Sequence, residues 1–419
     1  MPAEISIVWT IITALLLYFM HGGFGFFEAG MCRAKNTVDT LSHNLMVLAV
    51  TTLVYWAFGF AFMFGDGNGF IGYSGFAPRL VGSSDNYPSL AIHIVPLAVA
   101  FAFSMSYADT PATLIAGTGA ERIQFSAVML LTVVISGLLF PIVGHWILGG
   151  GWLAQLDVPV YDIGSGVIHL TGGICALAAG VVLGPRMEHK SESEGEEEDV
   201  SSMPLVFLGA FILWLGFFAF NAGFAMVAGK PLGLVVVNTA LGGSAGTVTG
   251  MIGAELTTGK ARLRTAMVGL LTGNVAVLSS TAIVEPWIAT TIGAAAGLLA
   301  VGSIHFWAYL KVDDPTEYLT MNVVGGILGI IAVGLFASPE IMAEYPAKTL
   351  PRAGLFYGGG SAQLISQALA TGAIIGFVLP AALFVCWILR SMGWLRIPAE
   401  EEKEGSDKAT HGEDAYEDK

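Results

Sequence analysis

The sequence predicts an all-α polytopic membrane protein with eleven transmembrane helices, arranged as an inverted five-helix repeat plus one extra helix. The first observation is composition: of 419 residues, 54% are hydrophobic and 12% are charged, and the mean hydropathy is +0.71. A soluble protein of this length has too little interior to bury so much apolar surface. The second observation is a motif, His169-Leu-Thr-Gly-Gly-Ile, that recurs as Asn322-Val-Val-Gly-Gly-Ile in a later apolar stretch.

The apolar stretches predict where the helices lie, because a helix needs about 20 mainly apolar residues to cross a bilayer. An odd number of spans places the two termini on opposite sides of the membrane. Spans one to five and six to ten then start from opposite sides, which is the arrangement of an inverted repeat. The last span is the extra helix. The expected spans lie near residues 5–27, 41–64, 90–117, 125–148, 163–184, 203–225, 232–257, 264–283, 287–310, 320–337 and 364–393.

Basic residues predict the orientation, because lysine and arginine concentrate in cytoplasmic loops. Of the 18 lysines and arginines, only four fall on one side of the expected spans: Arg79, Lys230, Lys348 and Arg352. The other fourteen fall on the opposite side. We therefore expect a multi-pass protein of the plasma membrane, with its N-terminus outside and its C-terminus in the cytoplasm.

The acidic residues gather in two short polar segments, so the net charge of −14 does not describe the membrane part. Seven of the 32 acidic residues lie in 188–199 and nine lie in 400–419. We expect residues 1–398 to form the transmembrane domain, with 188–202 as a disordered acidic cytoplasmic insert. Residues 399–419 are expected to form a cytoplasmic C-terminal tail. Nothing in the chain is basic enough to bind nucleic acid.

Each copy of the repeated motif places one polar side chain inside an apolar span, one turn before a pair of glycines. A polar residue at membrane depth is costly and by default indicates a functional site, and paired small residues let another helix approach closely. His169 and Asn322 occupy corresponding spans, so we expect them to be partners at the repeat interface. This pattern favours a transporter or a channel. A helix–helix hydrogen bond with no role in transport is the alternative for Asn322.

Two carboxylates accompany this pattern. Asp162 precedes His169 by two helical turns and is expected on the same helix face, at the outer mouth of the span. There it either caps backbone N–H groups alone or also adds negative potential for an incoming cation. Asp109 stands beside a proline in mid-span. It is expected to line a cavity, to face a subunit interface or to be held protonated, and the sequence does not decide among these.

Two aromatic pairs have helical spacing. Phe103 with Tyr107, and Phe220 with Phe224, are each four residues apart and so share a helix face. Rings in a pore would block water, and a ring face near the mouth attracts a small cation. Ordinary packing in the core is the alternative.

The chain lacks the motifs of ATP-driven and proteolytic membrane proteins. It contains no Walker loop, no Gly-x-Ser-x-Gly and no His-Glu-x-x-His. Its other histidines show no ligand spacing, and Cys32, Cys175 and Cys386 have neither metal nor disulfide spacing. We therefore expect no enzymatic activity, no metal and no cofactor.

Five motifs in order, together with the tail, resemble the ammonium transporter, methylammonium permease and Rhesus protein family over nearly the full chain. The resemblance implies a homotrimer in the lipid bilayer with one pore per subunit. Ammonium would be recruited at an outer aromatic site, deprotonated, and passed as ammonia beyond a phenylalanine gate to two facing histidines. Whether a PII-type signalling protein binds the cytoplasmic face stays open. The matching segments are Phe27-Glu-Ala-Gly-Met-Cys-Arg-Ala-Lys-Asn36, Gly119-Ala-Glu-Arg-Ile-Gln-Phe125, Gly164-Ser-Gly-Val-Ile-His169, Phe220-Asn-Ala-Gly223, Asp313-Asp-Pro315 and the tail from Ile397 to Tyr416.

The resemblance assigns roles to individual residues of this chain. Phe103 and Tyr107 match the outer aromatic positions, with tyrosine where the family usually has phenylalanine. Phe220 matches the second ring of the gate, and His169 matches the first pore histidine.

The chain also departs from the family. Tyr161 stands where the family has its aspartate, with Asp162 one place later. Leu148 stands at the outer tryptophan position, Phe224 replaces a serine, and Asn322 stands at the second pore histidine. With leucine at position 148, the chain lacks the ring face and the indole N–H of that tryptophan. Phe224 supplies a ring in its place. Asparagine can hydrogen-bond ammonia but cannot titrate, so a proton relay through two imidazoles is not available.

The favoured interpretation is an ammonium/ammonia transporter with a divergent pore. An ammonium-binding sensor or regulatory protein with little flux is the first alternative, and the pore departures favour it. A channel for another small neutral molecule, such as carbon dioxide or methylamine, is the second. The transported species (ammonium ion, ammonia, or ammonia plus a proton) stays open at this point.

Overall fold

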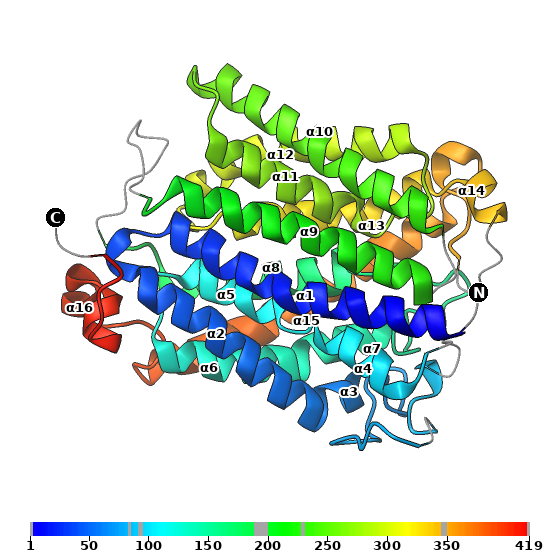
Figure 1. The fold of residues 1–419 in the computed structure, drawn as a ribbon, viewed down its shortest axis with the longest axis horizontal. Helices are drawn as coiled ribbons and strands as arrows, with labels where there is room; N and C mark the ends of the chain where they lie inside the picture. The colour runs from blue at the N-terminus through cyan, green and yellow to red at the C-terminus, as the bar shows by residue number, and fades with distance from the viewer. Residues whose placement is uncertain are drawn as a thin grey trace.

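The computed structural model describes residues 3–82, 85–90, 95–187, 200–227, 231–344 and 350–416, and these ranges contain helices and no β-strand. The acidic part of the expected insert, 188–199, and the basic residues Lys190, Lys230, Lys348 and Lys419 lie outside them. Figure 1 shows the long helices running side by side along one common direction. The α-helices are α1 (Ala3–Met31), α2 (Thr37–Val54), α3 (Phe60–Phe64), α4 (Leu97–Met105), α5 (Thr110–Gly119), α6 (Phe125–Val134), α7 (Phe140–Ile147), α8 (Thr171–Leu183), α9 (Met203–Val227), α10 (Leu232–Thr258), α11 (Leu263–Leu278), α12 (Pro286–Tyr309), α13 (Gly325–Phe336), α14 (Pro339–Ala343), α15 (Ala362–Ser391) and α16 (Ala399–Glu404).

Shorter helical turns connect or extend these helices. The turns of π-helix are η2 (Tyr55–Gly59), η4 (Ile135–Leu139), η5 (Ser165–Leu170), η7 (Thr320–Val324) and η9 (Asp407–His411). The turns of 3-10 helix are η1 (Ala34–Asn36), η3 (Pro88–Leu90) and η8 (Leu355–Tyr357).

Helix lies in every apolar stretch expected from the sequence. Eight of the described helical segments are long and apolar enough to cross a membrane, and two shorter apolar helices occupy 263–278 and 320–336. The stretch expected near 90–117 is instead divided between α4 and α5, because residues 106–109 form a turn. Pro111 lies at the start of α5, where its missing N–H costs nothing, whereas it would have interrupted a continuous helix. The all-α polytopic class is confirmed, and the count of eleven spans stays a prediction.

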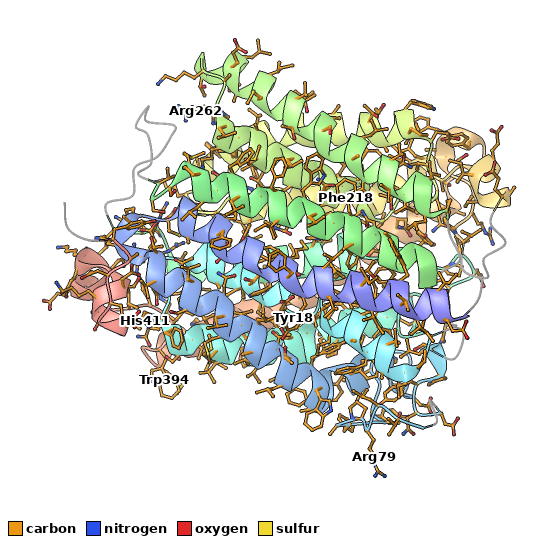
Figure 2. The ribbon with its side chains drawn as sticks, viewed as in Figure 1. Tyr18, Arg79, Phe218, Arg262, Trp394 and His411 are labelled. Atoms are coloured by element: carbon orange, nitrogen blue, oxygen red, sulfur yellow. The ribbon has the colours of Figure 1, made fainter. Side chains whose placement is uncertain are left out.

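The two ends of the helix bundle are formed by different segments of the chain. In Figure 1, α1 begins at one end of the bundle and α16 lies at the opposite end. Arg262 and His411 lie at the α16 end, and Arg79 lies at the other end (Figure 2).

A buried ion-pair cluster closes the α16 end. Arg186 contacts Glu121 at 2.6 Å and Asp313 at 2.9 Å, and Arg33 also pairs with Glu121. Arg122, which is fully buried, donates to the backbone carbonyl of Asp313 at 2.8 Å. Since an uncompensated buried charge costs several kcal/mol (of order 3–5 when one partner is removed), these contacts determine how the loops meet at this end.

The C-terminal segment packs on the start of α2. The backbone N–H of Ser406 donates to Oδ1 of Asn36 at 2.9 Å, and the backbone N–H of Asp39 donates to the carboxylate of Asp407 at 2.8 Å. Nε2 of His411 lies 2.9 Å from Oδ1 of Asp39. Burial raises the pKa of the Asp407 carboxyl, because its charged form loses contact with water.

The second glycine of each pair in the repeated motif, Gly173 and Gly326, lies at the contact between the two halves. A Cβ atom at Gly173 would lie 3.0 Å from the carbonyl carbon and the Cβ of Asn322. A Cβ atom at Gly326 would lie 2.7 Å from the backbone oxygen of Ser165 and 3.0 Å from the backbone nitrogen of Leu170. Each glycine thus packs against the turn that carries the polar residue of the other motif. The predicted close approach of helices at these glycines is confirmed.

Candidate functional site

His169 and Asn322 lie in matching turns of π-helix and contact each other. His169 belongs to η5, which continues into α8, and Asn322 belongs to η7, which continues into α13. The Nδ1 atom of His169 lies 2.7 Å from Oδ1 of Asn322. The residues are 5% and 3% exposed. A turn of π-helix widens the helix locally and occurs often at functional sites.

The hydrogen bonds around this pair determine which atoms are donors. Nδ2 of Asn322 donates to the backbone carbonyl of Tyr318 at 2.9 Å, so Oδ1 of Asn322 is the atom that accepts from the imidazole. In the neutral imidazole, the proton of His169 therefore lies on Nδ1 and Nε2 is unprotonated. No hydrogen bond from the described residues occupies Nε2. This nitrogen can accept an N–H or O–H group from a small molecule.

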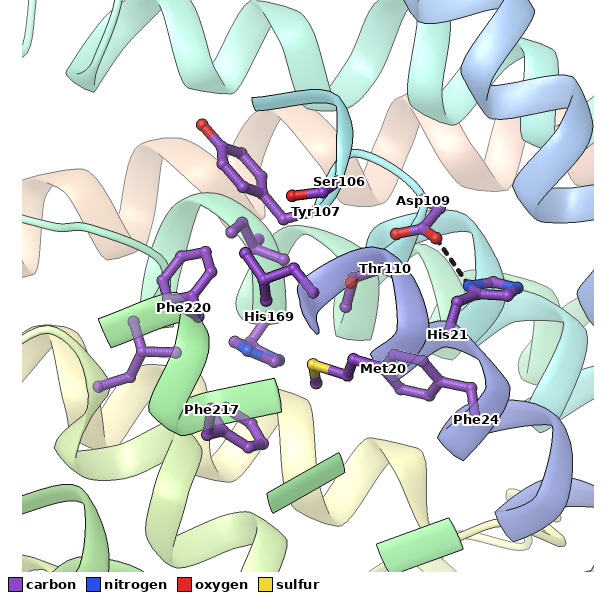
Figure 3. Close-up of a pocket in the computed structure, with 13 residues that line it drawn as sticks. Met20, His21, Phe24, Ser106, Tyr107, Asp109, Thr110, His169, Phe217 and Phe220 are labelled. Atoms are coloured by element: carbon purple, nitrogen blue, oxygen red, sulfur yellow. Dashed lines mark ion pairs between the residues drawn. The ribbon is translucent and has the colours of Figure 1, made fainter. Parts of the chain in front are cut away.

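Two small cavities meet at His169, and each has a volume of about 20 Å³. A cavity of this size holds about one water-sized molecule. Asn322 borders the second cavity, and His169 borders both. Figure 3 shows the first cavity, with side chains from α1, α9 and the α4–α5 turn pointing into it. Both cavities share Met20, Phe24, His169 and Phe217; the first adds His21, Ser106, Tyr107, Asp109, Thr110 and Phe220, and the second adds Tyr318, Met321 and Asn322.

The two aromatic pairs expected from the sequence come together in one group, here named the ring cluster: Phe103, Tyr107, Phe220 and Phe224. The ring centroids are 5.1 Å apart for Phe103 and Phe224, 4.8 Å for Phe220 and Phe224, and 5.5 Å for Tyr107 and Phe220. Tyr107 and Phe220 border the first cavity and not the second. The ring cluster therefore covers the first cavity on the side away from Asn322.

Phe217 is a cavity residue that the sequence reasoning missed. Its ring stacks on the imidazole of His169, with centroids 5.5 Å apart and an interplanar angle of 22°. It lies three residues before Phe220, so helical spacing would have placed it on the same face of α9.

Asp162 lies in the loop before η5, not on the helix as expected. Its carboxylate accepts the backbone N–H groups of Gly166 at 3.1 Å and Val167 at 2.7 Å, and it also accepts the hydroxyl of Ser279. These contacts match the capping role, since exposed N–H groups at a helix start need acceptors. Asp162 borders neither cavity, and it holds in place the turn that carries His169.

Two of the positions that depart from the family pattern also lie away from the cavities. Leu148 directly follows α7 as its C-cap, and it is only partly buried. The backbone of Tyr161 is held by Gln367 of α15, which accepts from the Tyr161 N–H at 3.0 Å and donates to its carbonyl at 2.7 Å.

Asp109 and His21 form a buried pair in the wall of the first cavity. Nδ1 of His21 lies 2.7 Å from Oδ2 of Asp109 (dashed in Figure 3), and Nε2 of His21 lies 2.6 Å from the backbone oxygen of Asn44. Of the three expectations for Asp109, the structure supports a cavity-lining position. His21 was missed, although a histidine inside an apolar span is itself a functional signal.

A second buried polar group, also missed, lies beside this pair. Glu28 is fully buried and accepts from Nδ2 of Asn44 at 2.6 Å and from the hydroxyl of Tyr318 at 2.9 Å. Tyr318 borders the second cavity. Among the described residues, no group of three or more His, Cys, Asp or Glu side chains could hold a metal ion.

Comparison with known proteins gives one consistent result. Residues 8–416 match the family model described as Ammonium Transporter Family. The chain is 35% identical over 430 residues to ammonium transporter Amt2 of Archaeoglobus fulgidus, covering 98% of this chain and 88% of that protein. It is 31% identical to ammonium transporter 1 member 3 of Solanum lycopersicum, covering 99% of this chain and 93% of that protein.

Solved structures agree with these sequence relatives. A protein named Sensor Amt Protein has a TM-score of 0.86 to this chain at 30% identity, and the match covers 98% of both chains. Mep2 of Saccharomyces cerevisiae has a TM-score of 0.87 at 23% identity, covering 99% of this chain and 91% of that one, which shows a shared fold.

Proposed function

The chain belongs to the Ammonium Transporter Family, and from this premise we propose that it carries ammonium or ammonia across the membrane through a narrow conduit in each subunit. The single observation that carries this proposal is the pair of 20 Å³ cavities that meet at His169, one of which is bordered by Asn322. Their size suits a molecule as small as ammonia. The neutral Nε2 of His169 supplies a hydrogen-bond acceptor between them.

The ring cluster is the proposed recruitment site. Ring faces attract a small cation by about 0.5–2 kcal/mol each, more when water is excluded. Phe224 lies within 5.1 Å of Phe103 and 4.8 Å of Phe220 between ring centroids, so it provides the ring that Leu148 does not. Packed rings over the first cavity also keep bulk water out.

The His169–Asn322 pair is the proposed guide for ammonia within the conduit. Ammonia donates N–H groups to Nε2 of His169, while Asn322 holds the imidazole in the tautomer that leaves this nitrogen open. Asp162 supports the arrangement by capping the turn on which His169 lies. Because Asn322 cannot titrate, protons do not pass between the two side chains.

The proposed location is the plasma membrane, with the start of α1 outside and α16 in the cytoplasm. The arginines of the ion-pair cluster support this orientation, since the cluster contacts the C-terminal segment: the Ile397 N–H donates to the carbonyl of Arg122 at 3.0 Å, and the N–H of Met187, next to Arg186, donates to Glu402 of α16 at 2.6 Å. Arg262 lies at the same end. Arg79 lies at the opposite end. The acidic insert at 188–202 belongs to the cytoplasmic side in this orientation.

We further propose a homotrimer whose 399–419 tail lies at the cytoplasmic face and is regulatory. The family resemblance supports this assembly, and the contacts of Ser406 and Asp407 with Asn36 and Asp39 support a tail that is held against the membrane domain. A PII-type signalling protein is the proposed partner at that face. Its test is co-purification with and without residues 399–419.

An ammonium sensor with little flux is the second candidate. The observation that favours it is the likeness to the protein named Sensor Amt Protein, at 30% identity over 98% of both chains. The substitution of asparagine for the second pore histidine favours it as well. The two functions differ in whether bound ammonium is released on the far side.

Purified protein in proteoliposomes separates the two functions. Uptake and current are measured across an ammonium titration; saturable flux supports the transporter, and binding without flux supports the sensor. His169→Ala should lower flux by a factor between about 5 and about 150, because a lost acceptor in a dry site costs about 1–3 kcal/mol. His305→Ala is the control, since this exposed histidine of α12 borders neither cavity. Unchanged uptake in His169→Ala would place the conduit elsewhere.

A further inference from the structure

We propose that Asp109 provides an inner binding site for the ammonium cation, in the first cavity and beneath the ring cluster. The inference rests on the proposed function, since it requires ammonium to pass the rings. It places the protonated form, the ammonium ion, at a position beside His169. Neither the family pattern quoted above nor the aromatic spacing contains this carboxylate.

The carboxylate of Asp109 is buried and has unused acceptor capacity. Asp109 is 3% exposed and lies in the turn between α4 and α5, where Figure 3 shows it at the cavity wall. It precedes α5 without its side chain capping that helix. Nδ1 of His21 forms an ion-pair contact with Oδ2 at 2.7 Å, and no other described residue donates a hydrogen bond to that oxygen. A carboxylate has about four lone-pair positions, so such a group requires a ligand that donates hydrogen.

The rest of the cavity wall fits a cation that carries N–H groups. The hydroxyl of Ser106 donates to the backbone oxygen of Phe103 at 2.7 Å, which leaves its own oxygen free to accept. Tyr107 and Phe220 present rings, and the other lining atoms are mostly carbon. Ammonium can donate to the few oxygens and direct its remaining N–H groups at ring faces. A sodium ion would lose its water oxygens without replacement, so the wall favours ammonium.

The electrostatics of the pair are compatible with a bound cation. Nε2 of His21 faces a backbone oxygen at 2.6 Å, so that nitrogen carries hydrogen. The 2.7 Å contact requires one proton between Nδ1 and Oδ2, so the attraction for a cation comes from the lone pairs of the carboxylate that do not face His21. A low-dielectric wall strengthens its attraction for a cation compared with bulk water. Glu28, held through Asn44, adds a second buried carboxyl behind His21.

The test is direct binding of ammonium chloride to the purified full-length protein by titration calorimetry, with sodium chloride titrated as the reference. Asp109→Asn keeps the shape and removes the charge, and it should weaken ammonium binding by on the order of tenfold or more. Asp39→Asn is the matched control. Asp39 is another 3% exposed aspartate beside histidines, His43 at 3.7 Å and His411 at 2.9 Å, and it borders neither cavity. This control should bind ammonium as the unmodified protein does.

Each outcome decides the proposal. Ammonium binding lost in Asp109→Asn and kept in Asp39→Asn supports it, provided that both variants show the thermal unfolding of the parent protein. If Asp109→Asn is less stable, Asp109→Glu keeps the charge and should retain binding that Asp109→Asn lacks. Equal affinity in Asp109→Asn and the parent overturns the site, and equal affinity for sodium overturns its assignment to ammonium. The two proposals can fail separately. If ammonium binding depends on Asp109 but His169→Ala leaves uptake unchanged, the proposed conduit is refuted and the Asp109 site is still supported.

Discussion

Gly173→Ala tests whether the contact between the two halves controls the conduit. A Cβ atom at this position would lie 2.9 Å from the backbone nitrogen of Val323 and 3.0 Å from two carbons of Asn322. Ordinary van der Waals contact begins at 3.4 Å, so α8 and η7 must separate by about 0.4–0.5 Å. The 2.7 Å contact between His169 and Asn322 would then lengthen to about 3.2 Å, the outer limit of a normal N–H···O bond.

The expected cost has two parts. Adding a methyl group to a packed backbone contact destabilises a protein by about 1–3 kcal/mol, which should lower the thermal unfolding temperature of the purified protein. Weakening a hydrogen bond worth about 1 kcal/mol lowers the population of the correctly oriented imidazole roughly fivefold. We therefore expect Gly173→Ala to reduce ammonium uptake in proteoliposomes by at least that factor.

Gly376→Ala is the matched control for this substitution. Gly376 lies inside α15, and a Cβ atom there would have no neighbour within 4 Å. Alanine stabilises a helix interior by up to about 1 kcal/mol relative to glycine, so uptake and stability should be equal to or above those of the parent protein. Full uptake in Gly173→Ala, or an equal loss in both variants, would refute the reasoning.

The remaining predictions concern the missing histidine and the tail. Asn322→His places a second imidazole in contact with His169, as in the family pattern. A proton relay between the two should raise the electrical current measured per ammonium taken up, and an unaltered ratio of current to uptake would count against such a relay. Deleting 400–419 removes the contacts of the tail with α2 and should impair coupling between subunits, measured as the loss of cooperativity in uptake; parental activity would make the tail dispensable. Asp407→Asn is the control for that deletion. It keeps the oxygen that accepts the Asp39 N–H, and since burial raises the pKa of the Asp407 carboxyl, a neutral side chain should leave the tail docked.

The sequence was most informative where lipid imposes strict rules. Every backbone polar group in a bilayer must be satisfied within its own segment, so apolar length predicts helix position, and all expected stretches contain helix. The contact between His169 and Asn322 was predictable from the repeated motif. The glycines of the two motifs, which lack a Cβ atom, allow the two helices to approach closely enough for this contact.

The sequence was least informative about rotation and about breaks within helices. A span that is apolar on all sides carries no periodic pattern to show which face points inward. For that reason Tyr318 was missed, whereas His21 and Phe217 did carry a signal, a histidine inside an apolar span and the three-residue spacing to Phe220. All three residues border a cavity. Asp162 lies before η5 and not on a helix face. Its carboxylate is needed there to accept the backbone N–H groups of Gly166 and Val167, which have no acceptor within the helix.

Composition, span length and the repeated motif by themselves determined that this is a helical membrane protein with a polar pair at its centre. Only the tertiary structure decided which side chains share the cavities, because that depends on turns of π-helix at His169 and Asn322 and on a helix break before Pro111. The helix break, in particular, brings Asp109 of the α4–α5 turn within 2.7 Å of His21 on α1. Such contacts arise from the packing of distant segments, which spacing along the chain does not encode.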